Sequence, residues 1–203
     1  SYDLALAYYP QPGDVLEADA FIKNFQNYIV SRSLNSATTT TRTFENINGA
    51  SAQGIILEAI HNFRALPAPF DGLGINSNIT IVNATANVIQ GQGKSILPQS
   101  YPLTYNATET YNKYGVHFDL AESYTSRNLF GVGSDPSTNV YTAPIFRLDL
   151  NVAYDLNPHL QLFFQGKNLT NSVLEFTQSA SKEFPVQREY YGQDFLVGVH
   201  YKL

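Results

Sequence analysis

Histidine is the residue type best suited to metal binding or proton transfer at neutral pH, and this chain has only a few, widely scattered. The four are His61, His117, His159 and His200. They lack the short spacings that metal sites use. His117 and Asp119 fall on one face of a predicted strand, as do His200 and Lys202 on another. A polar surface wetted by water explains both pairs, so the spacing predicts no metal centre.

Other reactive patterns are equally weak. No cysteine is present, which excludes a disulfide framework, a zinc–thiolate site and a thiol nucleophile. The stretch Gly91–Ser95 reads GQGKS, but it lacks the first glycine of a phosphate loop and follows no buried parallel strand. No G-x-S-x-G elbow occurs. We therefore expect no enzymatic activity and no bound cofactor.

The composition is polar without being charged. Of 203 residues, 14% are charged, against roughly 25% in an ordinary soluble domain. Asn and Thr together outnumber the charged residues, and 14 Tyr and 13 Phe argue against disorder. The net charge of -5 argues against a nucleic-acid-binding surface. No signal peptide and no long apolar helix is apparent, and the absence of Met favours a processed product or a piece of a longer chain.

Alternation with a period of two is the dominant pattern. In Leu16–Lys23, Phe146–Asp155 and Phe195–Leu203, apolar residues take every second position and polar residues most of the others. A strand collects such residues on one face, whereas a helix would spread them around its surface. The sequence therefore predicts an all-β fold.

Turn-forming residues divide the chain into nine predicted strands joined alternately by short turns and long polar loops. The strands are Tyr2–Tyr9, Val15–Ile29, Glu45–Phe63, Leu73–Asn83, Tyr105–Tyr111, Val116–Tyr124, Ile145–Leu156, Leu160–Asn168 and Glu189–Leu203, and the loops are Ser31–Arg42, Ala84–Ser100, Ser126–Thr142 and Ser172–Pro185. This arrangement, with Tyr and Phe near strand ends, is typical of an antiparallel transmembrane β-barrel. A soluble β-sandwich produces a similar alternation and stays open as an alternative.

Several segments, in order along the chain, resemble the C-terminal part of TonB-dependent outer-membrane receptors. They are Tyr2–Ile29, Asn48–Gly54 followed by Glu58, Leu66–Gly74, the sequence FQGKNLTN at Phe164–Asn171, and Tyr191–Gln193 before an alternating last strand. The NLTN element (Asn168, Leu169, Thr170, Asn171) carries the resemblance most directly. The last strand, with Phe195, Val197, Val199, Tyr201 and Leu203, resembles the terminal strand that outer-membrane assembly machinery reads, although the family usually ends in Phe.

The resemblance implies a barrel of about 22 strands with an N-terminal plug domain. Residues 1–203 would then be the C-terminal portion of the barrel, and an odd number of strands cannot close alone. We expect the remaining barrel strands and the plug in a missing part or another chain. The other partners implied are the TonB–ExbB–ExbD energising complex, outer-membrane lipid and lipopolysaccharide, the barrel assembly machinery and a possible surface lipoprotein. The implied location is the bacterial outer membrane.

In that family substrate binds at plug apices and extracellular loops. The candidate contacts lie in two predicted loops: Arg127, Asn128, Phe130, Asp135, Asn139 and Tyr141 in one, and Glu175, Gln178, Lys182, Glu183 and Phe184 in the other. Aromatic, amide and carboxylate groups suit a sugar, and Leu66–Gly74 and Phe164–Asn171 look like the carbohydrate branch of the family. The expected function is therefore active uptake of a carbohydrate. A siderophore receptor, a passive porin and a soluble carbohydrate-binding sandwich are the alternatives.

Overall fold

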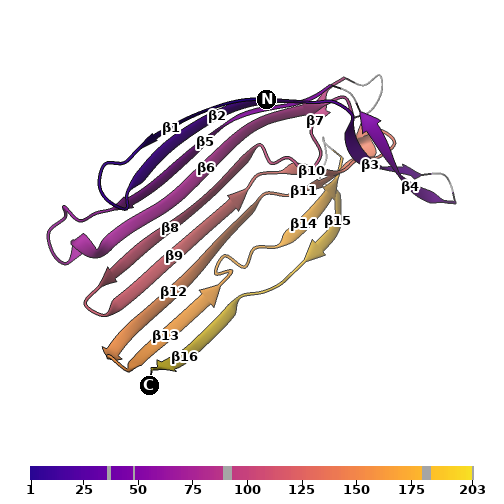
Figure 1. Ribbon diagram of the computed structural model, residues 1–203. Helices are drawn as coiled ribbons and strands as arrows, with labels where there is room; N and C mark the ends of the chain where they lie inside the picture. Colours follow the sequence, from indigo (N-terminus) through magenta and orange to yellow (C-terminus); the bar gives the residue numbers. More distant parts are fainter. Residues whose placement is uncertain (36–37, 48, 89–92, 180–183, 203) are drawn as a thin grey trace.

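A computed structural model describes residues 1–35, 38–47, 49–88, 93–179 and 184–202. Nine strands lie side by side in one curved sheet (Figure 1). In their order across the sheet they are β1 (Tyr2–Tyr8), β2 (Val15–Phe25), β5 (Ala50–Asn62), β6 (Leu73–Ala86), β8 (Leu103–Lys113), β9 (Val116–Thr125), β12 (Ile145–Asn157), β13 (Leu160–Lys167) and β16 (Asp194–Tyr201). A short strand, β7 (Ser95–Ile96), pairs with β6. The predicted all-β antiparallel fold is confirmed.

The sheet has two unlike ends. Short connections between β1 and β2, β5 and β6, β8 and β9, and β12 and β13 form one end, called here the turn end (Figure 1). The longer connections gather at the opposite end, called the loop end. Each described neighbouring pair is antiparallel. Among the described strands, β1 and β16 have a partner on one side only, so the sheet is open and the barrel does not close on its own.

The sheet has an apolar face and a polar face. In β2, exposed and half-buried residues alternate at every position, and the register places Leu4 opposite Ala20 and Ala20 opposite Ile55. Directly opposed residues share a face, so the apolar positions of successive strands continue one surface. Exposed side chains of this face include Leu6 and Phe195. The described strands of this sheet therefore follow one continuous path and are not divided into two facing layers, which excludes the sandwich alternative for this part of the chain.

The terminal strand follows the same rule. Phe195, Val197, Val199 and Tyr201 all lie on the apolar face, opposite apolar-face residues of β13, and all are exposed. Leu203 lies outside the described residues. On the polar face of this strand, the Phe163 ring lies over Gly198. A Cβ added at Gly198 would come within 2.4 Å of the ring.

All four predicted loops contain or overlap strands. Residues of the first form a hairpin of β3 (Tyr28–Asn35) and β4 (Thr40–Ile47). Two later loops supply β10 (Asn128–Gly131), β11 (Val140–Thr142), β14 (Leu174–Gln178) and β15 (Phe184–Glu189), which form a separate four-stranded sheet, together with a turn of 3-10 helix, η2 (Pro136–Thr138). The fourth, Ala84–Ser100, contains the end of β6 and also β7.

Three predicted strands are interrupted because single residues leave the extended conformation. The predicted strand Glu45–Phe63 is divided between β4, which ends at Ile47, and β5, which begins at Ala50, and Gly49 between them has a φ of 79°. The predicted strand Val15–Ile29 breaks after Phe25, where Asn27 has a φ of 53°. The predicted strand Glu189–Leu203 breaks at Gly192, with a φ of 74°. Asn and Gly tolerate this left-handed region better than other residues, so the interruptions redirect the chain at the loop end.

Most of the fully buried apolar side chains described lie at the loop end and not within the long sheet. They are Val30, Ile47, Ala50, Ala52, Ala84, Ala86, Val88, Leu97, Leu129 and Val132. Residues of the β3–β4 hairpin and of the predicted loops Ala84–Ser100 and Ser126–Thr142 thus form one buried cluster with the loop-end halves of β5 and β6. Among the described residues, no helix is long and apolar enough to cross a membrane.

Candidate functional site

The four-stranded sheet at the loop end brings the two predicted contact loops together. Its strand order is β10-β11-β14-β15, so β11 of the first loop pairs directly with β14 of the second. The guanidinium of Arg127 lies 4.3 Å from the centre of the Tyr141 ring. The Arg127 Nη2 atom also donates hydrogen bonds to the Ser179 carbonyl oxygen at 3.0 Å and to Thr177 Oγ1 at 3.5 Å. Arg127 therefore ties the two loops to one another.

Two of the predicted contact residues are buried at this sheet. Asn128 is 2% exposed and Asn139 is 4% exposed. The Asn139 side-chain oxygen accepts a hydrogen bond from the Gly133 N–H at 2.9 Å. Asn128 pairs with Thr142 in the register. Both amides would reach a substrate only if the loop sheet opened.

Other predicted contact residues are presented to solvent. Phe130 is 50% exposed, and its ring packs edge-on against Phe176 with centroids 4.8 Å apart. Phe184 is 57% exposed and lies opposite Gln178 in the register of β14 and β15. Glu175 forms an ion pair with Arg188 at 2.9 Å. The exposed aromatic rings are the groups of this set that a bound molecule could reach without rearrangement.

The remaining predicted residues contribute locally or lie outside the described part. Asp135 caps η2: its carboxylate accepts hydrogen bonds from the Ser137 hydroxyl and the Ser137 N–H, at 2.5 Å and 2.8 Å. These hydrogen bonds, that of the Ser137 hydroxyl first, lower the pKa of Asp135 below its ordinary value. Lys182 and Glu183 fall outside the described residues.

Sequence reasoning missed several members of this cluster. Thr177, Ser179, Phe176 and Arg188 each contact a predicted residue. The alternation of Leu174–Gln178 was a usable signal for a strand there. The pairing of that strand with β11 could not be predicted, because the two segments lie far apart in the sequence.

The NLTN element closes the loop end of β13. Asn168 has a φ of 52° and turns the chain out of the sheet. Its backbone N–H donates to Asp149 Oδ1 at 2.7 Å, its side-chain amide donates to the Gly192 carbonyl at 2.7 Å, and its side-chain oxygen accepts from the Ser172 N–H at 2.9 Å. Asn168 thus joins β12, through its backbone N–H, to the segment that leads into β16, through its side chain.

The other residues of the element extend this attachment. The Leu169 N–H donates to the Leu148 carbonyl at 2.8 Å, and the Thr170 hydroxyl donates to the Phe146 carbonyl at 3.0 Å. The Asn171 N–H donates to the Asn168 carbonyl at 2.8 Å. The motif that carried the family resemblance therefore has a structural role, at the boundary between the long strands of the sheet and the loops.

A second polar network lies at the turn end. Asp14 is 1% exposed and accepts hydrogen bonds from the Asn62 backbone N–H at 3.1 Å and the Asn62 side-chain amide at 3.0 Å. His61 Nδ1 lies 2.8 Å from the other carboxylate oxygen. The hydrogen bond from the Asn62 side chain is the largest influence that lowers the pKa of Asp14. These contacts join the first turn to the end of β5.

Neighbouring turns carry similar pairs. Lys113 forms an ion pair with Asp71, and the hydrogen bond from Lys113 lowers the pKa of Asp71. His117 Nε2 lies 2.8 Å from Asp155 Oδ2. His117 and Asp119 lie on the same face of β9, as predicted, but the side chain that His117 contacts is that of Asp155.

The remaining histidines also contact neighbours on adjacent strands. His159 Nδ1 lies 3.1 Å from the Lys202 carbonyl oxygen, and the His200 ring stacks on Phe163 with centroids 4.6 Å apart. Within the described ranges, no group of three or more acidic or histidine side chains is arranged to hold a metal ion.

Comparison with known proteins gives a family for most of the chain. A family model described as "TonB dependent receptor-like, beta-barrel" matches residues 1–169. No curated protein matches the chain. Several solved structures do match, at identities low enough that the likeness shows the fold alone.

Three of these structures illustrate the likeness. The ferric-catecholate import receptor Fiu from E. coli K12 is 14% identical, with a TM-score of 0.69, over 98% of this chain and 27% of its own. The ferric citrate transporter FecA is 18% identical, with a TM-score of 0.67, over 98% of this chain and 30% of its own. The copper transporter OprC is 17% identical, with a TM-score of 0.65, over 98% and 30%.

The chain therefore spans less than a third of the length of each of these proteins. An open antiparallel sheet, long loops at one end and short turns at the other agree with a segment of such a barrel. Together with the family match over residues 1–169, this shows that the chain belongs to the TonB-dependent receptor family, as part of its β-barrel.

Proposed function

We propose that this chain forms part of the wall and extracellular loops of an outer-membrane receptor that imports a metal chelate, with a ferric siderophore as the leading substrate class. The apolar face of the sheet would meet lipid and the polar face would meet the lumen. The turn end would lie at the periplasm and the loop end outside the cell. Barrels of this family are outer-membrane proteins, and the exposed apolar face of the sheet is consistent with that location.

The single observation that carries the substrate class is the cargo named for the structural relatives. Two of the three reported above carry ferric complexes and the third carries copper. The loop sheet offers groups that suit an anionic chelate: the Arg127 guanidinium beside Tyr141, and the exposed Phe130 and Phe184 rings for stacking.

Carbohydrate uptake, the leading expectation from the sequence, has no comparable support. The two segments that suggested it have structural roles. Leu66–Gly74 contains the 3-10 turn η1 (Phe70–Gly72), fixed by the ion pair of Asp71 with Lys113. Asn168 holds the strand ends together. Neither role depends on the substrate.

As part of the proposal, the missing barrel strands and the plug belong to the same receptor, and a TonB–ExbB–ExbD complex supplies the energy. Both edge strands of the open sheet need partners, because each unpaired backbone group in lipid costs several kcal/mol. Assembly machinery would read the terminal strand, and lipopolysaccharide would surround the barrel.

The substrate class is tested with the full-length receptor in its own cell. Deletion of its gene is expected to abolish growth on one ferric chelate as sole iron source, while growth on free ferrous iron is retained as the control. Iron starvation is expected to induce expression. Induction by a glycan, with growth on every ferric chelate unchanged, would overturn the proposal.

Energy coupling is tested separately. Uptake of the radiolabelled ferric chelate is expected to stop when the proton-motive force is dissipated. Uptake that continues at the same rate after dissipation would favour the passive porin.

A further inference from the structure

The apolar face of the sheet carries charge at one place away from the strand ends. On the nine long strands, the register puts every Asp, Glu, Lys and Arg side chain on the polar face except those of Glu109, Lys113 and Glu122. Lys113 is the last residue of β8 and pairs with Asp71. The two glutamates lie within β8 and β9 and are therefore exceptional.

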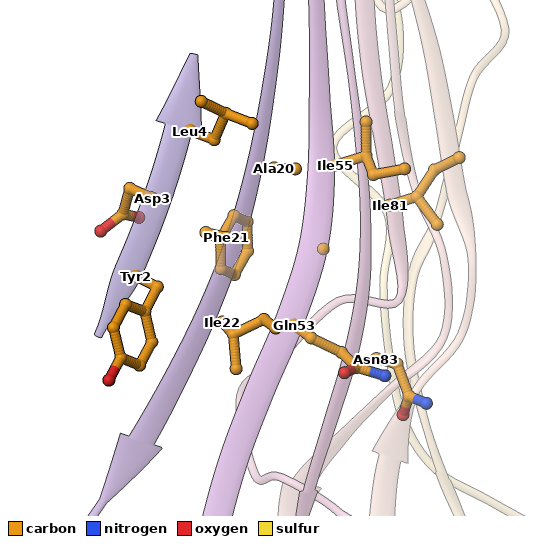
Figure 2. A pocket seen from close by; sticks show the side chains of 11 residues that line it. Tyr2, Asp3, Leu4, Ala20, Phe21, Ile22, Gln53, Ile55, Ile81 and Asn83 are labelled. Atoms are coloured by element: carbon orange, nitrogen blue, oxygen red, sulfur yellow. The ribbon is translucent and has the colours of Figure 1, made fainter.

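Other parts of this face show the ordinary pattern. Figure 2 shows an uncharged row in which Leu4, Ala20, Ile55 and Ile81 follow one another across β1, β2, β5 and β6. A face of this kind can meet lipid without exposing a charged group to it. The face around the two glutamates cannot.

Aromatic side chains flank the two carboxylates along the strands. On the loop-end side, Tyr105 stacks on Tyr124 with ring centroids 5.6 Å apart, and on the turn-end side Tyr111 lies directly opposite Phe118. Tyr105 and Tyr111 are about 20 Å apart along β8. Aromatic residues of outer-membrane barrels gather at the two membrane interfaces. Under the proposed function, the carboxylates therefore lie between the interfaces, at the depth of the lipid tails.

Neither carboxylate has a cationic partner within the described part of the chain. Glu109 lies between Ile75 and Leu120 in the register, and its Oε2 atom is inaccessible to solvent and has no hydrogen-bond partner there. Glu122 also has apolar residues directly opposite it on both neighbouring strands. The ion pairs among the described residues include neither glutamate. Because an unpaired ionisable group at membrane depth is costly, a partner outside this chain is required.

The charge of this surface selects among possible occupants. We call it the β8–β9 patch, and it consists of Tyr105, Ala107, Glu109, Leu120, Glu122 and Tyr124. A lipid acyl chain offers no hydrogen-bond donor. A second copy related by a two-fold axis would set the patch against itself and bring like charges together. The described residues supply no third acidic or histidine side chain for a metal ion. Under the proposed function, the missing strands pair with the sheet edges and the plug lies inside, so neither covers the patch.

We propose that the β8–β9 patch is a docking surface for a membrane-embedded segment of another protein, which presents a Lys or Arg side chain to Glu109 and Glu122. Charge complementarity determines this choice, because a carboxylate in apolar surroundings is stabilised only by a closely paired cation. The tyrosines beside the carboxylates suit a protein interface, where such residues are enriched. The proposal relies on the proposed function only for the placement of this face in the membrane.

The test uses the full-length receptor in its own cells, with a photoreactive diazirine amino acid in place of Ala107. Ala107 lies directly opposite Glu122 and on the same strand face as Glu109. Irradiation is expected to give an adduct with one other protein, and the crosslinked peptide of that protein is expected to contain Lys or Arg. The same amino acid in place of Ala20, in the uncharged row, is expected to give lipid adducts only.

Removal of the charges shows whether the carboxylates make the contact. Glu109→Gln combined with Glu122→Gln is expected to reduce the adduct by about tenfold or more, relative to the amount of assembled receptor. The matched control is Glu17→Gln combined with Glu58→Gln. These two glutamates are directly opposed on the polar face, so their replacement is expected to leave the adduct unchanged. Exchange of the partner's Lys or Arg for Glu is expected to remove the adduct.

Three results would overturn the proposal. They are lipid adducts alone from the position of Ala107, an adduct with a second copy of the receptor, and a protein adduct that is unchanged when the two charges are removed.

A second measurement needs no variant. A phospholipid with a diazirine on its acyl chain, added to intact outer membranes, is expected to label peptides of β8 and β9 less than those of β2. Equal labelling of these strands would contradict the docking surface. Absence of labelling from all of them would instead contradict the placement of the apolar face against lipid, which belongs to the proposed function.

Discussion

At the scale of single residues, Asp14 shows how one carboxylate can join a turn to the end of a strand that is distant in the sequence. It is nearly fully buried, and its acceptor positions are filled by the backbone and side chain of Asn62 and by His61. These donors favour the ionised carboxylate, so the pKa of Asp14 is lowered in the folded state, with the Asn62 side chain as the largest cause.

This shift predicts an acid-dependent effect. A carboxyl group with a lowered folded-state pKa adds stability above its ordinary pKa of about 3.9, and that stability is lost as the pH falls through the lowered value. We expect Asp14→Asn to lower the unfolding temperature of the full-length barrel at pH 7, and to have little effect once the pH is below the folded-state pKa. The measurement is heat-modifiable migration on a detergent gel at both pH values.

Asp3→Asn is the matched control. Asp3 lies 3.8 Å from Lys23 with about half of its side chain exposed, and pairs of that kind contribute little. If Asp14→Asn and Asp3→Asn lower the unfolding temperature at pH 7 by the same amount, the role given to Asp14 is contradicted.

Arg127 is the residue on which the proposed site depends most. We expect Arg127→Ala to weaken chelate binding by about tenfold or more, equal to about 1.4 kcal/mol or more, because the change removes the stacking on Tyr141 and the link to Ser179. Titration of the purified receptor with the ferric chelate measures it.

Arg188→Ala is the control for this change. Arg188 is 49% exposed at its side chain and pairs with Glu175 at 2.9 Å, an arrangement worth about 0–1 kcal/mol. If Arg188→Ala weakens binding as much as Arg127→Ala, the site lies elsewhere in the loops.

Neither of these residue-scale contacts was predictable from the sequence. Asp14 and His61 are 47 positions apart, and Arg127 and Thr177 are 50 apart. Residue types identified Arg127 and Tyr141 as candidates, but only the paired strands show which side chains meet. The same types also selected Asn128 and Asn139, which the loop sheet buries.

At the scale of strands, two neighbouring isoleucines on β5 allow the apolar face and the polar face of the sheet to be compared directly. Ile55 lies on the apolar face opposite Ala20, and the next residue, Ile56, lies on the polar face opposite Asp19. A lysine on the lipid side of a barrel strand costs about 2–4 kcal/mol at the bilayer midplane, and polar-face positions tolerate the charge.

We therefore expect Ile55→Lys to reduce the amount of receptor assembled in the outer membrane and Ile56→Lys to leave it nearly unchanged. Immunoblots of outer-membrane fractions measure the amount. Equal assembly of the two variants would argue that the apolar face does not meet lipid.

The Asn168 turn gives a second prediction at this scale. We expect Asn168→Ala to destabilise the loop end by roughly 1–3 kcal/mol, because it leaves the Gly192 carbonyl and the Ser172 N–H without their partner. Hydrogen exchange of amides near Ser172 measures the change. Asn106→Ala, which removes one exposed hydrogen bond to Asn78, is expected to change it little.

Alternation predicted the nine long strands and their faces because side-chain period and burial are local properties. It failed where single residues redirect the chain, as at Asn27 and Gly192, since a positive φ breaks a strand without changing its hydrophobic pattern. It also missed β11 and β14, which have three and five residues and whose stability depends on pairing with one another.

At the scale of the whole molecule, the long sheet has little interior of its own. The described apolar residues that are buried most completely lie at the loop end, while large side chains along the sheet are exposed, Leu4 and Val197 by 75% and 79%. Under the proposed function, lipid would cover one face of this sheet and the rest of the receptor would pair with its edges.

This predicts the behaviour of the chain in isolation. In detergent, residues 1–203 alone are expected not to form a heat-modifiable species, because the open edges of β1 and β16 leave backbone groups unpaired. Co-refolding with the remaining strands of the receptor is expected to restore it. A compact species from residues 1–203 alone would contradict the open sheet.

The antiparallel order of the strands also limits how copies could associate. Eight antiparallel steps separate β1 from β16, so the two edges point the same way. Two copies turned about an axis normal to the membrane would bring β16 of one beside β1 of the other as parallel strands. A ring of two copies is thus incompatible with the fully antiparallel pairing of outer-membrane barrels. A separate segment that closes the barrel by pairing with both β1 and β16 in the antiparallel manner must itself have an odd number of strands.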